Sequence, residues 1–545
     1  MIDNNDYSKT YDSIVNRFSK GSRLENERTF SEAFTKYVIK SGKFIKNRGV
    51  KFVNQLGGVP LGQVNNGEEI IVDSSDAHTL IIGSTGSKKS RLVVMPTIHI
   101  LGKAGESMIV SDPKAEIYGR TANVLLNEGY KIEVINLRNP SYGNAWNPLS
   151  IPYSFYKNED IDKACEFVND ISTNLMLSEK SSKDPYWDYS AGDLFFGLTL
   201  LLFKYCKHMK INEDYVNISN LLKLRKHIFR LQNLKSSLFW NLIEDDDIIS
   251  SSLLGTIEAP DKTQACILST FDEKMRCFMI QPSLLEMLSN NSISMDCISE
   301  KKTIIYLIMP DEKTSYHKLI TLFIKQSYEY LIYKAQVNID GKMKIRVNYI
   351  LDEFSSLPTI KDFPAMITAA RSRNIRFNLV IQSKHQLIER YKEETETIQS
   401  NCNNWIFFTS REIKLLEELS MLCGKRADGE KYVIPLASLQ HFNKSRGEAL
   451  ILSGRLYPFI STLADIEKYD NGKYLFLEFE KERRNRYTTI DFNIKSELDM
   501  EQIKNEQINE KDKRTDEKNE YDLQKELEEK FDELFGPLED SDEEE

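Results

Sequence analysis

The sequence predicts an α/β protein with a mostly parallel sheet, into which an all-helical domain is inserted. Two regions, 79–136 and 303–452, alternate short apolar runs with helical patterns, as βαβ units do. Between them, residues 151–299 carry apolar residues at three- and four-residue spacing and few strand-like runs. Because 545 residues exceed what one hydrophobic core supports, we expect two or three domains.

The first apolar run, residues 79–82, is followed by a loop typical of phosphate binding. This loop reads Gly-Ser-Thr-Gly-Ser-Lys-Lys-Ser-Arg over residues 83–91 and opens a predicted helix. In such a loop, backbone N–H groups and a helix N-terminus point at one phosphate group. We expect ATP to bind here, with Lys89 reaching the outer phosphates and Ser90 holding Mg²⁺. The predicted binding residues are Gly83, Ser84, Thr85, Gly86, Ser87, Lys88, Lys89, Ser90 and Arg91.

Lys88 stands where the pattern G-x-x-x-x-G-K-[ST] has glycine. A side chain there costs about 1–3 kcal/mol if the loop keeps its usual backbone angles, whereas the charge of Lys88 favours a polyphosphate. The loop by itself therefore leaves two interpretations open, a nucleotide site and a Ser/Gly-rich turn between a strand and a helix.

Two later strands end in polar residues suited to ATP hydrolysis. The apolar run 345–351 ends in Asp352, which we expect to anchor Mg²⁺, and in Glu353, which we expect to accept a proton from the attacking water. The alternative is an ordinary strand end capped by acids. Gln382 follows the strand at 377–381, where an amide can orient water or sense the outer phosphate.

Other polar residues near the predicted sheet are less specific. Arg371 and Arg373 lie on a predicted exposed helix, and they are either arginine fingers that serve a neighbouring subunit or ordinary surface arginines. Residues 112–116 follow the strand at 107–111, and they therefore face the crevice in which open α/β sheets bind ligands.

Composition argues against several other kinds of site. The seven cysteines form no C-x-x-C pair and the seven histidines no H-E-x-x-H spacing, so neither a disulfide framework nor a metal other than Mg²⁺ is supported. No apolar run reaches the roughly 18 residues that span a bilayer, and the N-terminus has no secretory signal. We therefore expect a cytoplasmic protein.

Charge is distributed unevenly along the chain. From residue 496 to the end there are 21 acidic and 7 basic residues, whereas residues 1–495 carry 61 acidic and 65 basic ones. Residues 1–55 hold 11 basic and 6 acidic residues, which predicts either a basic arm that touches DNA or a membrane, or a helix packed on the body. The acidic tail is predicted to be disordered and either to dock on a partner or only to aid solubility.

Taken in order, these motifs resemble the type IV coupling proteins of conjugative DNA transfer, the TraG/TraD family within the FtsK-like and RecA-like motor ATPases. The resemblance covers roughly residues 75–465. The matching residues are I-G-S-T-G-S at 82–87, V-S-D-P-K-A-E at 110–116, W-N-P-L at 146–149, D-P-Y-W at 184–187, L-D-E-F at 351–354 and I-Q-S at 381–383, followed by Gln386, Leu387 and Tyr391. An ordered set of this kind is far more specific than any one motif.

The resemblance implies a RecA-like P-loop motor domain that binds ATP and Mg²⁺ at the subunit interfaces of a homo-hexameric ring. In that ring, Arg371 or Arg373 would act on a neighbour's nucleotide. The implied task is to deliver relaxase-bound single-stranded DNA to a type IV secretion channel. The chain departs from the family at Lys88, and the family's usual N-terminal transmembrane hairpin is missing. We therefore expect a membrane protein to recruit it to the inner face of the cell membrane, through residues 1–55.

The expected organisation is a basic N-terminal arm (1–55), a first part of the P-loop ATPase domain (56–150), an all-helical domain (151–299), a second part of the ATPase domain (300–491) and an acidic, largely disordered tail (492–545). Two other functions stay open. One is an adaptor that binds nucleotide weakly and recruits DNA-processing cargo, which Lys88 motivates. The other is another FtsK-like DNA-packaging ATPase, which shares the core but not the element at 144–149.

Overall fold

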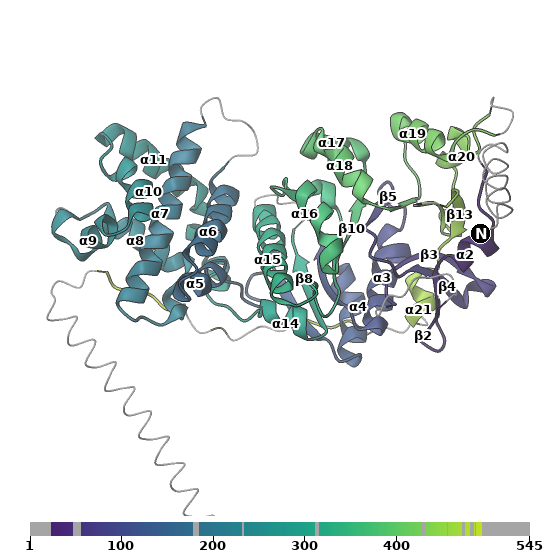
Figure 1. Ribbon diagram of the computed structural model, residues 1–545, viewed down its shortest axis with the longest axis horizontal. Coiled ribbons are helices and arrows are strands. Elements are labelled where there is room, and N and C mark those ends of the chain that lie inside the picture. Colours follow the sequence, from purple (N-terminus) through teal and green to yellow (C-terminus); the bar gives the residue numbers. More distant parts are fainter. Residues whose placement is uncertain are drawn as a thin grey trace, which may run out of the picture.

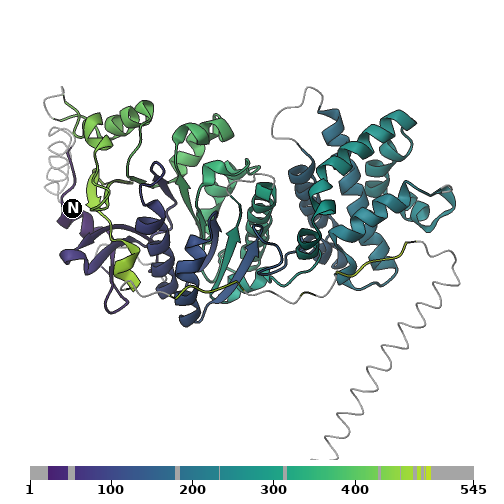
Figure 2. The same cartoon turned by 180° about the vertical axis from the view of Figure 1, so that it is seen from behind.

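A computed structural model describes residues 23–492, apart from gaps at 47–55, 178–184, 232–233, 311–315, 427–430, 455, 471–474, 480–483 and 485–486. The start of the predicted basic arm, Asp184 of the D-P-Y-W motif and the acidic tail from 493 on lie outside the described residues. The described part has two bodies, one built on a sheet and one all-helical, which lie side by side (Figures 1 and 2).

The larger body contains a nine-stranded sheet with the strand order β13-β12-β11-β5-β10-β9-β6-β8-β7. The seven strands from β11 to β7 are parallel, and β12 and β13 add an antiparallel edge. The strands are β5 (Thr79–Ile82), β6 (Ser107–Asp112), β7 (Lys131–Asn136), β8 (Thr303–Ile308), β9 (Val347–Leu351), β10 (Ile375–Ile381), β11 (Asn404–Phe407), β12 (Glu448–Ser453) and β13 (Phe459–Thr462). The predicted mostly parallel sheet is confirmed.

Strand side chains alternate between two hydrophobic cores, one on each face of the sheet. In β6, Met108 and Val110 pack with helices α3 (Met95–Ala104) and α4 (Glu116–Asn127), whereas Ile109 packs with α15 (His317–Val337) and α16 (Phe363–Ala370) on the other face. Because both faces are covered, the central strands are apolar throughout. The remaining helices of this body are α17 (Lys384–Tyr391), α18 (Glu394–Asn401), α19 (Ile413–Cys423), α20 (Leu436–Gln440) and α21 (Ile466–Asp470).

The described part of the N-terminal arm forms a small antiparallel sheet. Helix α2 (Glu27–Glu32) precedes β1 (Thr35–Val38) and β2 (Lys43–Ile45), which join β3 (Val59–Val64) and β4 (Glu69–Asp73) in the order β2-β1-β4-β3. Of the helix that the sequence offered as one alternative for residues 1–55, the described residues contain only α2, and residues 35–38 and 43–45 form strands instead. The β-branched and aromatic residues of β1 pair with β4, and Tyr37 becomes fully buried.

The smaller body is all-helical, as predicted. Its longest helix, α7 (Tyr186–His208), packs against α6, α10 and α11. The other helices are α5 (Ser150–Lys157), α6 (Ile161–Met176), α8 (Ile218–Ile228), α9 (Leu238–Glu244), α10 (Asp247–Ile257), α11 (Asp261–Lys274), α12 (Arg276–Ile280) and α13 (Pro282–Met287). Helix α14 (Met295–Glu300), although it lies in the stretch 151–299, packs against α15, β6 and β8 of the sheet body (Figure 1). None of the helices in the described ranges has the length and hydropathy that crossing a membrane requires.

The end of the described chain returns to the helical body, although the sequence placed it with the sheet. Asn217 and Asn220 of that body both donate to the carbonyl oxygen of Thr488, at 3.1 Å. Phe492 packs among aromatic side chains of the same body, including Phe239. Residues 487–492 therefore tie the second half of the chain to the helical body (Figure 2).

Candidate functional site

The predicted phosphate-binding loop lies at the carboxyl edge of the sheet, between the ends of two neighbouring strands. The N–H of Gly83 donates to the carbonyl oxygen of Ile381 at the end of β10 (3.2 Å), and the N–H of Ser84 to that of Thr409 just beyond β11 (3.0 Å). A bond from the Ser87 N–H to the Ser84 carbonyl oxygen (3.1 Å) closes the loop on itself. A π-helical turn, Ser90–Val94, then leads into α3.

Two loop residues have left-handed backbone angles, Gly86 with a φ of 77° and Lys88 with a φ of 65°. Glycine adopts such angles freely, whereas a residue with a Cβ atom does so at a cost of about 1–2 kcal/mol. Lys88 therefore occupies the glycine position of the motif in the conformation that glycine would take there. The loop keeps its shape and carries backbone strain.

Lys89 lies buried inside the loop. Its Nζ atom donates to the carbonyl oxygens of Gly83 and Ser84, the second at 3.3 Å. Burial lowers the pKa of Lys89, and the nearby carboxylates of Asp352 and Glu353 oppose that shift. The ammonium group of Lys89 therefore lies against carbonyl oxygens at the start of the loop.

Ser90 and Asp352 meet across the site. Ser90 Oγ donates to Asp352 Oδ2 at 3.0 Å, and Asp352 Oδ1 accepts from the Glu353 N–H at 3.0 Å. Burial raises the pKa of Asp352, while the bond from Ser90 and the charge of Lys89 act against that shift. The two predicted metal ligands thus lie close enough to share one cation.

A chain of side-chain hydrogen bonds connects the loop to the predicted general base. Thr85 Oγ1 donates to Gln382 Oε1 at 2.7 Å, and Gln382 Nε2 donates to Glu353 Oε1 at 2.8 Å. The carbonyl oxygen of the Gln382 amide thus accepts from the loop, and its NH₂ group donates to the Glu353 carboxylate. It fixes the distance between the loop and the end of β9.

Loop residues 85–91 line a pocket of about 340 Å³ together with Asp352, Glu353 and Gln382. Gly83 and Ser84, which the sequence also predicted as binding residues, do not line it. The pocket is also lined by Asp112 and Lys114, which the sequence placed in the crevice without a specific role, and by Lys444, which no motif indicated. Asp112 ends β6 and accepts from the Tyr118 N–H at 2.7 Å, and burial raises its pKa to about 7. Its place after a strand was the available signal. Lys444 comes from a loop far along the chain that carries no motif.

The residues present fit a nucleotide polyphosphate with Mg²⁺. Mg²⁺ prefers oxygen ligands, and the Ser90 hydroxyl and the Asp352 carboxylate supply them. The Ser87 hydroxyl is buried in the loop with no hydrogen-bond partner, as expected of a donor directed at a phosphate oxygen.

Arg91 lines the same pocket, but two carboxylates already engage its guanidinium. Arg91 Nη2 lies 2.7 Å from Asp465 Oδ1 and 2.6 Å from Glu467 Oε1. These bonds raise the pKa of Arg91. Arg91 therefore ties the loop to α21 at the rim of the pocket.

The structure does not bring Arg371 and Arg373 into this pocket. Both precede β10, whereas Gln382 follows it, and the seven residues of that strand separate its two ends by about 20 Å. Arg371 Nε pairs with Asp76 Oδ2 at 3.0 Å, and Arg373 Nη1 donates to the Ala369 carbonyl oxygen at 3.1 Å. Within one subunit, these arginines belong to the opposite edge of the sheet.

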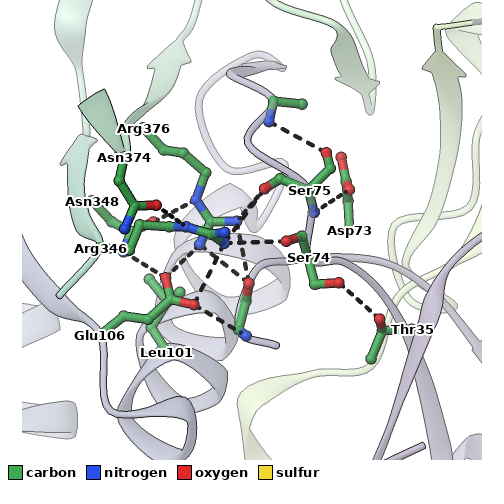
Figure 3. A network of polar contacts seen from close by, with 12 residues as sticks. Thr35, Asp73, Ser74, Ser75, Leu101, Glu106, Arg346, Asn348, Asn374 and Arg376 are labelled. Carbon is green, nitrogen blue, oxygen red and sulfur yellow. Dashed lines mark hydrogen bonds and ion pairs between the residues drawn. The ribbon is translucent and has the colours of Figure 1, made fainter. Parts of the chain in front are cut away.

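A buried polar network holds that opposite edge together (Figure 3). Glu106 is fully buried, and its Oε2 accepts from Arg376 Nη2 at 2.6 Å and from Asn348 Nδ2 at 2.9 Å. Arg346 donates to the Ser74 carbonyl oxygen (3.1 Å) and to Asn374 Oδ1 (2.9 Å). The network therefore fastens the turn that carries Arg371 and Arg373 to the segment leading into β5.

Comparisons with known proteins agree on one family. The family model described as "Type IV secretory system Conjugative DNA transfer" matches residues 28–431. The type IV secretion system-coupling protein VirD4 of Bartonella henselae is 21% identical over 365 residues, 65% of this chain and 54% of the relative. The probable conjugal transfer protein TraG of Sinorhizobium fredii is 20% identical over 352 residues, 64% of this chain and 52% of the relative. The chain spans about half the length of the curated relatives it matches.

A solved structure confirms the fold. The plasmid coupling protein TrwB, in complex with the non-hydrolysable ATP analogue ADPNP, matches with a TM-score of 0.53 at 14% identity, over 86% of this chain and 96% of that chain. The RecA-like α/β body with an additional helical body is thus shared with a known structure.

Proposed function

The chain belongs to the family of type IV secretory system proteins for conjugative DNA transfer, and from this membership we propose that it is a DNA-translocating ATPase. In this proposal it couples ATP hydrolysis to the delivery of relaxase-bound single-stranded DNA to a type IV secretion channel. One observation carries the ATPase part most directly. Ser90 of the loop lies within hydrogen-bond distance of Asp352 at the end of β9.

The residues of the pocket have separate roles in this proposal. Ser90 and Asp352 would hold Mg²⁺, which, when bound, offsets the charge of phosphate oxygens. Lys89 binds the phosphates together with backbone N–H groups of the loop other than those of Gly83, Ser84 and Ser87, which already donate to carbonyl oxygens. The plasmid coupling protein TrwB has been solved in complex with ADP and Mg²⁺, which supports binding of a nucleotide with Mg²⁺ by this chain.

Glu353 is the proposed general base. Its Oε1 accepts from Gln382 Nε2, so the carboxylate is held in place and its other oxygen is left to take a proton from water. Gln382 is a positioning residue, because it acts by orienting Glu353. Thr85 completes the arrangement by fixing the orientation of the Gln382 amide.

A homo-hexameric ring would give Arg371 and Arg373 a role that they do not have within one subunit. Their turn is anchored through Asn374 and Arg346 and lies at the edge of the sheet opposite to the pocket. A neighbouring subunit can present such a turn to the nucleotide as an arginine finger. Recruitment to the membrane by a separate protein belongs to the same proposal.

The test is ATP hydrolysis by the natural chain with and without single-stranded DNA. We expect DNA to stimulate hydrolysis and Glu353→Gln and Lys89→Ala to abolish it, because each removes a group that the reaction needs. Glu396→Gln, an exposed residue on α18, is the matched control and is expected to hydrolyse ATP normally. Equal rates with and without DNA would contradict the motor.

The second candidate function is an adaptor that recruits DNA-processing cargo and binds nucleotide weakly. The left-handed backbone of Lys88 favours it, since strain in the loop lowers affinity unless the lysine charge compensates. ATP affinities of the natural chain and of Lys88→Gly separate the two functions. The adaptor is excluded if the natural chain already binds and hydrolyses ATP well.

A further inference from the structure

One wall of the pocket is supplied by Lys444, which belongs to none of the motifs. It comes from the loop between α20 and β12, in the antiparallel extension of the sheet. Its Nζ atom lies 3.6 Å from the position that a Cβ atom would occupy on Gly86. Lys444 therefore approaches the middle of the phosphate-binding loop from outside, whereas Lys89 approaches it from within.

We propose that Lys444 is a phosphate-binding residue that selects nucleoside triphosphates over diphosphates. This inference rests on the proposed function and adds a specificity determinant to it. The reason for this assignment is the part of the loop that Lys444 faces. Gly86 follows Thr85, which bonds to Gln382 and through it to Glu353, so Lys444 stands at the end of the pocket where hydrolysis is proposed.

The chain holds the Lys444 backbone firmly. Asn443 Oδ1 accepts from the N–H groups of Ser445 (3.0 Å) and Arg446 (3.2 Å), which forms a tight turn around Lys444. The Asn443 N–H donates to Glu448 Oε2 at 2.8 Å, which fixes the turn to the start of β12. A preorganised loop loses little conformational entropy when its side chain binds a ligand.

Gly447 anchors the other end of this turn. It has a φ of 69°, and its carbonyl oxygen accepts from the Leu463 N–H at 2.9 Å. An added Cβ atom would lie 2.5 Å from the Leu463 carbonyl oxygen, so only glycine permits this approach. The turn is therefore fixed to Leu463, which directly follows β13, as well as to the start of β12.

Lys444 also differs from Arg91, the other cation at this rim, in its ion pairs. Arg91 at the same rim is engaged by Asp465 and Glu467, whereas Lys444 forms no ion pair with any residue in the described part of the chain. Its side chain is exposed. An ammonium group without a carboxylate partner at the rim of a phosphate pocket is available to a ligand oxygen, and such charge-assisted bonds are strong.

The experiment measures the affinities of the full chain for a non-hydrolysable ATP analogue and for ADP, both with Mg²⁺, by calorimetry. For Lys444→Ala we expect about a tenfold loss of affinity for the ATP analogue and less than about a twofold change for ADP. Lys444→Arg keeps the charge and is expected to retain most of the affinity. Arg446→Ala removes one positive charge from the same turn and does not line the pocket, so it should leave both affinities unchanged.

The outcomes separate this inference from the function on which it rests. If the natural chain binds the ATP analogue and Lys444→Ala binds it equally well, the inference is wrong while the proposed function stands. An equal loss for both nucleotides contradicts the assignment to the end of the triphosphate. If the natural chain binds neither nucleotide, the proposed function itself fails and the inference fails with it.

Discussion

Ser90 Oγ lies 3.0 Å from Asp352 Oδ2, although 262 positions separate the two residues in the chain. The sheet order explains this meeting. Strands β5 and β9 both pair with β10, so the loop after β5 and the acids after β9 emerge at the same edge, one strand apart. Gln382, which follows β10, fills the space between them.

Gln382→Ala is expected to slow ATP hydrolysis by about 10- to 100-fold with little change in ATP affinity. The reason is that Gln382 Nε2 orients Glu353 through a 2.8 Å hydrogen bond and contacts the loop only through Thr85. Steady-state hydrolysis and nucleotide titration measure the two effects separately. Gln440→Ala, at the exposed end of α20, is the control. A loss of affinity as large as the loss of rate would assign Gln382 to binding.

Lys88→Gly is expected to be more stable than Lys88→Ala by about 1 kcal/mol. Both variants remove the lysine charge, and only glycine relieves the backbone at a φ of 65°. The difference between their midpoints of denaturant unfolding therefore isolates the strain. Equal stabilities would mean that the loop relaxes to accept a side chain.

The stability of the protein is expected to fall as the pH drops from about 6.5 toward 4, in part because of His78. Its Nδ1 accepts from the Phe377 N–H at 3.0 Å, so Nε2 carries the hydrogen that is donated to the Ile367 carbonyl oxygen at 2.8 Å. Burial lowers the pKa of His78 to about 4. Below pH 6.5 the unfolded chain therefore binds a proton that the folded chain excludes, which costs up to about 1.4 kcal/mol per pH unit.

Unfolding curves between about pH 7.5 and about pH 4.5 cover most of this window and check the expectation. His78→Gln should be less stable at neutral pH and should lose less stability on acidification than the natural chain. His385→Gln changes an exposed histidine and serves as the control variant. The assignment fails if His78→Gln loses stability as steeply as the natural chain.

Glu106→Gln is expected to destabilise the protein by about 3–5 kcal/mol. The substitution keeps the shape of the side chain but removes the carboxylate that faces the buried guanidinium groups of Arg376 and Arg346, which lie 2.6 and 3.6 Å from its oxygens. Thermal and denaturant unfolding measure the change. Glu128→Gln breaks the partly exposed pair with Lys103 and should cost no more than about 1 kcal/mol.

Much of the pocket could be predicted from the sequence because the carboxyl ends of parallel strands all lie at the same edge of the sheet. An apolar run followed by Asp352 and Glu353, or by Gln382, can be recognised in the sequence. Because these strands are neighbours in a parallel sheet, the polar residues that follow them lie close together. Lys444 could not be found this way, because a single lysine in a polar loop looks like any surface residue. The network around Glu106 was hidden for a similar reason, since Arg346 and Arg376 are isolated charges whose burial depends on tertiary pairing.

The N-terminal sheet shows a different limit. The spacing of Phe34, Val38 and Phe44 fits one face of a helix, yet two of these residues belong to strands β1 and β2. Strand pairing, of β1 with β4 and of β2 with β1, decides their conformation rather than the spacing.

The central claim is that one nucleotide with Mg²⁺ binds between the loop at 83–91 and the acids after β9. Its most direct test is the affinity of the natural chain for ATP, measured by calorimetry with Mg²⁺ and again with a chelator, beside the variant Ser90→Ala. The account predicts a Kd below about 1 mM that weakens when Mg²⁺ is removed, and a Ser90→Ala affinity that no longer responds to Mg²⁺. A natural chain that binds no ATP, or binds it equally well without Mg²⁺, would contradict it.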